Sequence, residues 1–107
     1  MTTTLRLHAD DLFSEQAYRA LGYTTYGAAD IGEVTSTMAR ITTTDLDQWH
    51  DEWRATADRV RAVAYERHAA GDDVAARNAY FRASNYYRTA STMLMNPVVD
   101  PRLIECY

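Results

Sequence analysis

The sequence predicts an all-α fold of four to five helices, two of which pair as a long antiparallel hairpin. Apolar residues recur at spacings of three and four along four segments, which is the helical period. Acidic residues open these segments, and glycine or proline closes most of them. The only alternation with the period of a strand is Leu5 and Leu7, which is too short for a sheet. At 107 residues the chain predicts one helical domain over 1–107, with 1–9 as a flexible start.

The first predicted helix runs from about Asp10 or Asp11 to Leu21. Carboxylates at its start suit the positive end of the helix dipole. Gly22 is predicted to take the left-handed conformation that stops a helix, and a loop follows it. The apolar side of this helix consists of Leu12, Phe13, Ala17, Ala20 and Leu21.

The second predicted helix starts at Asp30. The run Asp30-Ile31-Gly32-Glu33 is a capping box: the Asp30 side chain accepts from the Glu33 N–H, and Glu33 reaches back to the Asp30 N–H. Thr42-Thr43-Thr44 ends the helix. Its apolar residues are Ile31, Val34, Met38 and Ile41.

The third predicted helix is the longest, with Thr44 as N-cap and Ala69-Ala70-Gly71 at its end. One face carries apolar residues at spacings of four, four, three and four, and three further residues widen that face. The central stripe is Trp49, Trp53, Ala57, Val60 and Ala64, and the widening residues are Leu46, Thr56 and Val63.

The fourth predicted helix runs from about Asp73 to Met95 and stops before Pro97. Val74 and Phe81 stand on a second face, and a helix with two apolar faces usually has two partners. The tail, residues 97–107, predicts the start of a further helix, with Asp100 as N-cap and Pro101 in its first turn. The main stripe consists of Ala76, Tyr80, Ala83, Tyr87, Ala90 and Leu94, widened by Ala79, Tyr86 and Met93.

The corner between the last two long helices resembles part of a tetratricopeptide unit. Gly71-Asp72 is followed by Ala76, Tyr80 and Ala83 at the spacing of that repeat's second helix. No second copy exists, and such repeats need neighbours to bury their faces. We therefore expect a helical hairpin rather than a repeat array.

Composition excludes several classes of partner. The net charge of −4 argues against a nucleic-acid partner, because nucleic acid needs a basic surface. No apolar run is long enough to span a membrane, and the N-terminus lacks the apolar core of a signal peptide. Cys106 is the only cysteine, which fits a cytoplasmic location.

The chain carries no recognisable catalytic or cofactor motif. It has no Gly-x-Ser-x-Gly nucleophile elbow and no phosphate-binding glycine loop. His8, His50 and His68 lack the spacing of metal ligands. Acidic pairs such as Asp72-Asp73 are explained by their places at helix starts. We predict no catalytic residue, no metal and no cofactor in these residues.

The aromatic residues of the two long helices allow two interpretations. They either line a ligand pocket or pack between the helices, and the second interpretation is favoured. Buried Tyr and Trp need a hydrogen-bond partner, and Arg82, Asn85 and Arg88 either supply it or face solvent. The aromatic residues are Trp49, Trp53, Tyr80, Tyr86 and Tyr87.

A wider resemblance covers residues 10–107. It rests on five segments in a fixed order, and it resembles the N-terminal helical region of serine α/β-hydrolases, in the group of the dihydroxypseudooxynicotine hydrolases and the polyketide-shortening hydrolases of pigment pathways. Such enzymes cleave carbon–carbon bonds in 1,3-dicarbonyl-type substrates, and their helical region packs on the hydrolase core as a lid. The segments are Tyr26-Gly27-Ala28-Ala29-Asp30-Ile31-Gly32-Glu33-Val34, Ala39-Arg40-Ile41, Trp49-His50-Asp51-Glu52-Trp53, Ala83-Ser84-Asn85-Tyr86-Tyr87-Arg88-Thr89-Ala90 and Asp100-Pro101-Arg102.

The resemblance implies a lid surface without catalytic residues. The Ser, acid and His of such enzymes come from a core that would follow residue 107, so none is carried over. Seven residues map to the surface that contacts the core or the substrate: Tyr26, Asp30, Trp49, Trp53, Tyr86, Tyr87 and Arg88.

Three functional hypotheses follow. The first is a lid or substrate-gating domain acting with a hydrolase core in cis or in trans. The second is a stand-alone, dimeric all-α module that binds a small hydrophobic ligand or a peptide. The third is a small natural-product pathway enzyme acting on a polyketide-like substrate. None of them involves nucleic acid or a membrane.

Overall fold

The structure is a computed structural model, and it describes residues 7–92 apart from the side chain of Tyr26. Its elements are α1 (Asp11–Leu21), the 3₁₀-helix η1 (Gly22–Tyr26), α2 (Ile31–Arg40), α3 (Leu46–Ala69) and α4 (Asp73–Ser91). No strand occurs in this part of the chain, so the predicted all-α fold is confirmed. The predicted tail helix and the extension of α4 to Met95 lie outside the described residues.

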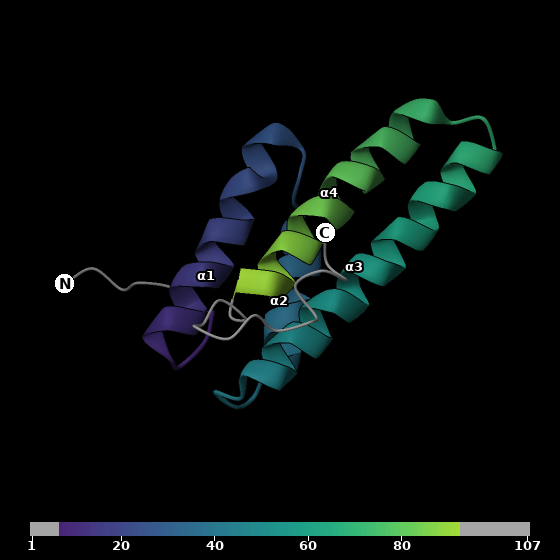
Figure 1. Cartoon of the computed structure of the whole chain (residues 1–107). Helices are drawn as coiled ribbons and strands as arrows, with labels where there is room; N and C mark the ends of the chain where they lie inside the picture. Colours follow the sequence, from purple (N-terminus) through teal and green to yellow (C-terminus); the bar gives the residue numbers. More distant parts are fainter. Residues whose placement is uncertain (1–6, 93–107) are drawn as a thin grey trace.

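The long hairpin of α3 and α4 dominates the fold. The two helices run antiparallel and pack along each other, joined by a short turn over residues 70–72. The shorter α1 contacts α2 and α4, and α2 contacts α3 (Figure 1). The turn of the hairpin projects beyond α1 and α2 (Figure 1). One half of the hairpin is therefore covered by other helices, while its tip is not.

Each α-helix begins at an aspartate, which explains its boundary. The carboxylate accepts a backbone N–H of the first turn, satisfying a donor that the helix leaves unpaired. Thr44 was the predicted cap of α3, but Asp45 takes that place, because its carboxylate accepts the Asp47 N–H at 2.9 Å. The other predicted starts are confirmed. The four caps and the residues whose N–H they accept are Asp10 with Phe13, Asp30 with Glu33, Asp45 with Asp47, and Asp72 with Ala75.

The glycine that ends the first helical segment is Gly27, not Gly22. Gly22 has a φ of −57° and continues the chain into η1. The tighter 3₁₀ turns take up the last carbonyl groups of α1, so no left-handed residue is needed at that point. The left-handed stop comes at Gly27, where φ is +74°, and a second one at Gly71, where φ is +80°.

A row of four aromatic rings forms the centre of the core. Phe13 of α1 lies against Trp49, Trp49 against Trp53, and Trp53 against Tyr86 of α4, with ring centroids 5.0, 5.8 and 5.6 Å apart. Small residues of α4 face this row and allow α3 and α4 to approach closely. They are Ala79, Ala83 and Ala90.

Several apolar residues predicted to be buried are exposed. Each helix finds a partner for only part of its apolar surface among residues 7–92, so apolar residues at the edge of a predicted face stay in solvent. The exposed fractions are 52% for Leu12, 61% for Ile31, 43% for Leu46, 44% for Val63 and 38% for Tyr80. Val74 and Phe81, predicted to lie on a second face of α4, are also exposed.

Candidate functional site

Three of the seven predicted site residues lie inside the bundle. Trp49, Trp53 and Tyr86 are fully buried, as the packing interpretation predicts. The Trp49 indole N–H donates to the Thr89 carbonyl at 2.8 Å. The Trp53 indole N–H is buried without a hydrogen-bond partner. Contact of these residues with a substrate stays a prediction.

Tyr86 joins α4 to the start of α2. Its hydroxyl accepts the Asp30 N–H at 2.9 Å and donates to the Glu33 carboxylate at 2.7 Å. Arg82, one turn earlier on α4, donates to the same Glu33 oxygen at 2.9 Å. The predicted capping box is therefore altered: Asp30 caps Glu33, but the Tyr86 hydroxyl occupies the place that the Glu33 carboxylate would take. We call these four residues, Asp30, Glu33, Arg82 and Tyr86, the cap cluster.

The cap cluster suits a structural role better than proton transfer. Burial raises the pKa of the Tyr86 hydroxyl, and the hydrogen bond to Glu33 raises it further. Tyr86 is thus a neutral donor at ordinary pH. Glu33 receives a hydrogen bond from Tyr86 and an ion pair from Arg82, so its charge is already balanced. Sequence reasoning placed Glu33 and Asp30 together, but the contribution of Arg82 and Tyr86 depends on the tertiary fold.

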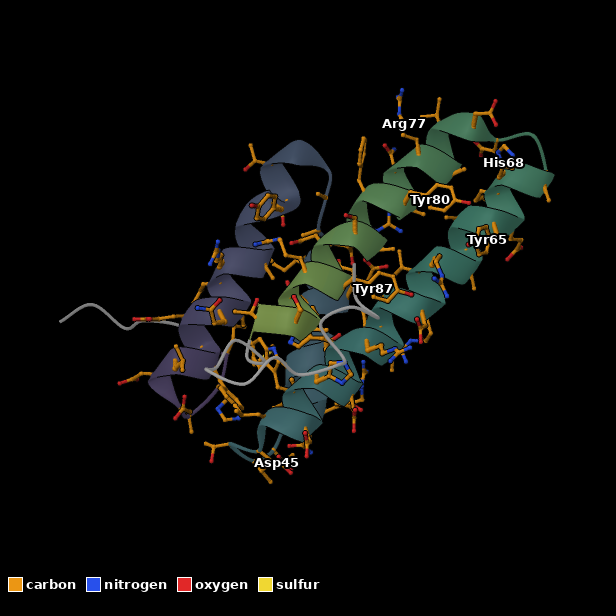
Figure 2. The ribbon with its side chains drawn as sticks, in the orientation of Figure 1. Asp45, Tyr65, His68, Arg77, Tyr80 and Tyr87 are labelled. Carbon is orange, nitrogen blue, oxygen red and sulfur yellow. The ribbon has the colours of Figure 1, made fainter. Side chains whose placement is uncertain are left out.

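Tyr87 follows Tyr86 in the sequence but lies on a different face of α4, at the edge of the hairpin. Its hydroxyl donates to the Asp58 carboxylate of α3, and the Arg61 guanidinium lies 5.5 Å from its ring centroid. Partial burial and the Asp58 carboxylate raise the pKa of Tyr87 to about 12. Figure 2 shows Tyr87 bridging the two helices on the same side as Tyr65 and Tyr80.

Arg88 and Asp30 are the other predicted site residues with accessible side chains. Arg88 donates to the Asn85 side-chain oxygen at 2.7 Å, and its guanidinium lies 4.6 Å from the ring centroid of Tyr23. Asn85 in turn donates to the carbonyls of Ala20 and Ala28, at 3.1 and 2.9 Å. The side chain of Tyr26, the seventh residue, lies outside what the structure describes.

The surface of the described residues includes two grooves that no predicted site residue lines. A groove of about 250 Å³ lies between α2 and α3, and one of about 310 Å³ lies near the tip of the hairpin, beside Tyr80 and Phe81. The first contains Arg40, Thr56 and Arg59, which sequence reasoning did not single out as a site. The only available signal was a threonine in the middle of a long helix next to arginines.

The described part of the chain holds neither a metal site nor a membrane helix. Within residues 7–92, no three His, Cys, Asp or Glu side chains gather closely enough to hold a metal ion. None of the helices in that range combines the length and apolar character needed to cross a bilayer.

Comparison with known proteins finds similarity to α/β-hydrolases, as the resemblance predicted. The chain is 37% identical over 93 residues to the α/β-hydrolase gkaG of Penicillium citrinum, covering 87% of the chain. It is 35% identical over 99 residues to the 20-hydroxy-prefusarin hydrolase FUS2 of Gibberella moniliformis, covering 92%. It is 40% identical over 93 residues to the α/β-hydrolase xenA of Xenoacremonium sinensis, covering 87%.

The chain is much shorter than these relatives. It spans 21%, 24% and 21% of the lengths of gkaG, FUS2 and xenA. No protein-family profile matches it, and the search of solved structures gives no match either. The chain is thus similar to one part of a hydrolase of this group.

Proposed function

We propose that this chain is the helical lid, or substrate-gating part, of an α/β-hydrolase-type enzyme. It acts with a hydrolase core, in cis or in trans. One observation carries the proposal: similarity to hydrolases extends over about nine-tenths of the chain, yet covers only about a fifth of each relative. The helical bundle, which has no strand over residues 7–92, fits the part of such an enzyme that lies outside the catalytic sheet.

The chemistry of the chain supports a non-catalytic role. Ester or carbon–carbon bond hydrolysis needs an activated nucleophile and an oxyanion site. The sequence holds no Gly-x-Ser-x-Gly motif. Among the described residues, the Glu33 carboxylate accepts hydrogen bonds from both the buried Tyr86 hydroxyl and the Arg82 guanidinium. We therefore assign proton transfer and nucleophilic attack to the core.

The surface of the hairpin supports a role in docking and substrate positioning. The exposed aromatic and aliphatic residues near its tip give a core a surface to pack on. Tyr87 and Arg88 are both half-buried, and we expect them to contact a substrate at the boundary with a core. A polyketide-like substrate would meet an aromatic ring and a guanidinium there. The exposed tip residues are Tyr65, Val74, Tyr80 and Phe81.

Assays with and without a core test this proposal. The purified 107-residue chain is incubated with an activated ester and with a 1,3-diketone, alone and as a replacement for the matching segment of gkaG. We expect no turnover by the chain alone and turnover by the chimera. In the chimera, Tyr87→Phe and Arg88→Ala should raise KM more than they lower kcat, while Tyr18→Phe, on the exposed side of α1, should change neither.

Turnover by the chain alone, abolished by Tyr87→Phe or Arg88→Ala, would overturn the lid proposal. It would support the third hypothesis, a self-contained natural-product enzyme. A chimera that folds and binds substrate as gkaG does, but is indifferent to both substitutions, would remove these two residues from the substrate-contact surface.

The second candidate is a stand-alone dimeric module. The exposed residues at the hairpin tip favour it, because a second copy can bury an apolar surface as well as a core can. Sedimentation of the chain at on the order of tens of micromolar distinguishes the dimeric module from the lid. A stable dimer that Phe81→Ser converts to monomer favours the module, while a monomer that joins a core favours the lid.

A further inference from the structure

The groove between α2 and α3 has an unusual arrangement of two arginines on one hydroxyl. Arg40 of α2 and Arg59 of α3 approach the Thr56 oxygen, at 3.0 and 2.9 Å. Val60 and Val63 of α3 form an apolar wall beside them, and the groove has a volume of about 250 Å³. Of the residues that line the groove, Glu33 alone belongs to the cap cluster, and none belongs to the predicted lid surface.

The Thr56 hydroxyl uses its one proton and both of its lone pairs in hydrogen bonds. The Thr37 hydroxyl donates to the Glu33 carbonyl at 2.7 Å, which uses its only proton. The 2.6 Å contact between the Thr37 and Thr56 hydroxyls must then use the proton of Thr56. The Thr56 oxygen therefore accepts from both arginines with its two lone pairs. The two guanidinium groups are held close together by a neutral group, without a shared carboxylate.

Among the described residues, Arg59 is the groove arginine without a carboxylate partner. Arg40 pairs with Glu52 at 3.3 Å, and Glu33, which also lines the groove, pairs with Arg82 at 2.9 Å. Over residues 7–92, Thr56 is the one hydrogen-bond partner of Arg59, and no carboxylate lies within ion-pair distance of it. Its neighbours three and four positions away on α3 are all uncharged: Ala55, Thr56, Ala62 and Val63. Four of the five N–H donors of this guanidinium have no acceptor among residues 7–92.

The volume of the groove and the residues that line it indicate which kind of ligand fits. Pockets for drug-sized ligands measure roughly 300–1,000 Å³, so this groove suits a smaller group. A guanidinium fork matches a carboxylate in a two-point hydrogen bond, and Val60 and Val63 suit a short apolar stem. We propose that the groove between α2 and α3 binds a carboxylate on a short apolar stem, with Arg59 as its anchor. Both a free short-chain acid and the acidic side chain of a partner protein present this chemistry.

Titration with a matched pair of small molecules tests the site. Backbone amide signals of the 107-residue chain are followed by NMR during addition of sodium butyrate, its neutral isostere butyramide, or sodium chloride. We expect butyrate alone to give saturable shifts that centre on Ser36, Arg40, Val60 and Val63. Arg59→Gln should weaken butyrate binding about tenfold, since it removes a charge-assisted hydrogen bond. Arg67→Gln, which changes a partly exposed arginine in the last turn of α3, should bind as the parent chain does.

The melting midpoint of each variant shows whether it folds. Arg40→Gln is a second variant that removes a positive charge from the groove. The proposal fails if butyramide shifts the same signals as strongly as butyrate, if the shifts do not saturate, or if folded Arg59→Gln binds butyrate unchanged. N-acetylglutamate N-methylamide, which imitates a glutamate side chain in a protein, distinguishes a free acid from the side chain of a partner. Binding as tight as that of butyrate supports occupation by a partner's side chain, whereas binding of butyrate alone supports a site for free acids.

Discussion

The Tyr86 hydroxyl donates to the Glu33 carboxylate at 2.7 Å, linking residues 53 positions apart in the sequence. The same oxygen accepts the Asp30 N–H, so one side chain of α4 completes the N-terminal cap of α2. A capping box is normally a local device within one helix start. In this protein it is a tertiary contact, and the position of α2 depends on a residue of α4.

Replacing Tyr86 with phenylalanine should therefore destabilise the domain without creating a large cavity. The change leaves the Asp30 N–H unpaired and removes one partner of Glu33, which costs about 1–3 kcal/mol in the free energy of unfolding. Urea unfolding measures the loss. Tyr18→Phe, in an exposed position of α1, should stay within about 0.5 kcal/mol of the parent chain. Equal losses for the two variants would contradict the cap-cluster assignment.

The two buried tryptophans should respond differently to the same substitution. Trp49→Phe and Trp53→Phe remove similar volume from one aromatic row. Trp49→Phe also breaks the hydrogen bond to the Thr89 carbonyl, whereas Trp53→Phe removes an N–H that has no partner. We expect Trp49→Phe to cost about 1–2 kcal/mol more. A larger loss for Trp53→Phe, measured by the same unfolding curves, would show that its N–H is paired in solution.

Replacing two nearby glycines by alanine should have opposite effects on the free energy of unfolding. Gly22→Ala places a side chain at helical φ with open space around it, so it should stabilise the chain by about 0.4–1 kcal/mol. Gly27→Ala forces a left-handed conformation on an L residue, which costs about 1–2 kcal/mol. The melting midpoint should rise for the first variant and fall for the second. A fall for both would indicate that Gly22 is left-handed in solution, as the sequence first suggested.

Alkaline pH should weaken the fold through its two buried or half-buried tyrosines. The folded pKa of Tyr87 is raised from 10.0 to about 12, and that of Tyr86 is raised as well. Because folding disfavours the ionised form, their contribution is complete below pH 10 and is lost as the pH rises towards 12. Tyr87→Phe should make the unfolding free energy less steep in this window. Tyr65→Phe is the control, and an equal flattening there would refute the assignment to Tyr87.

Local signals in the sequence were enough to place the helices. The aspartate starts of three helices, the apolar spacing and Gly71 are short-range features that the structure follows. The cap of the remaining helix, predicted at Thr44, is at Asp45. Burial was harder to predict, because the period of Ile31 or Val63 shows which side of a helix is apolar but not whether another helix covers it. Gly22 illustrates the same limit: a glycine permits a left-handed stop without requiring one.

The candidate site was less predictable than the fold. Tyr86 and Glu33 were each noticed, but their contact depends on how α4 crosses the start of α2. The two-arginine groove combines residues of α2 and α3 that have no shared motif in the sequence. Their proximity follows from helix packing, and a single sequence does not specify the distance between two side chains on different helices.

The turn over residues 70–72 has a consequence for the order in which the chain assembles. Closing so short a loop costs little entropy, so α3 and α4 can pair as soon as both have formed. By contrast, the amide of Asn85 reaches the Ala20 carbonyl across 65 residues. On the ribosome, α1 and α2 emerge before the surface that buries them has been synthesised. Because α1 packs on α4 as well as on α2, we expect part of its apolar face to stay uncovered until α4 has been synthesised.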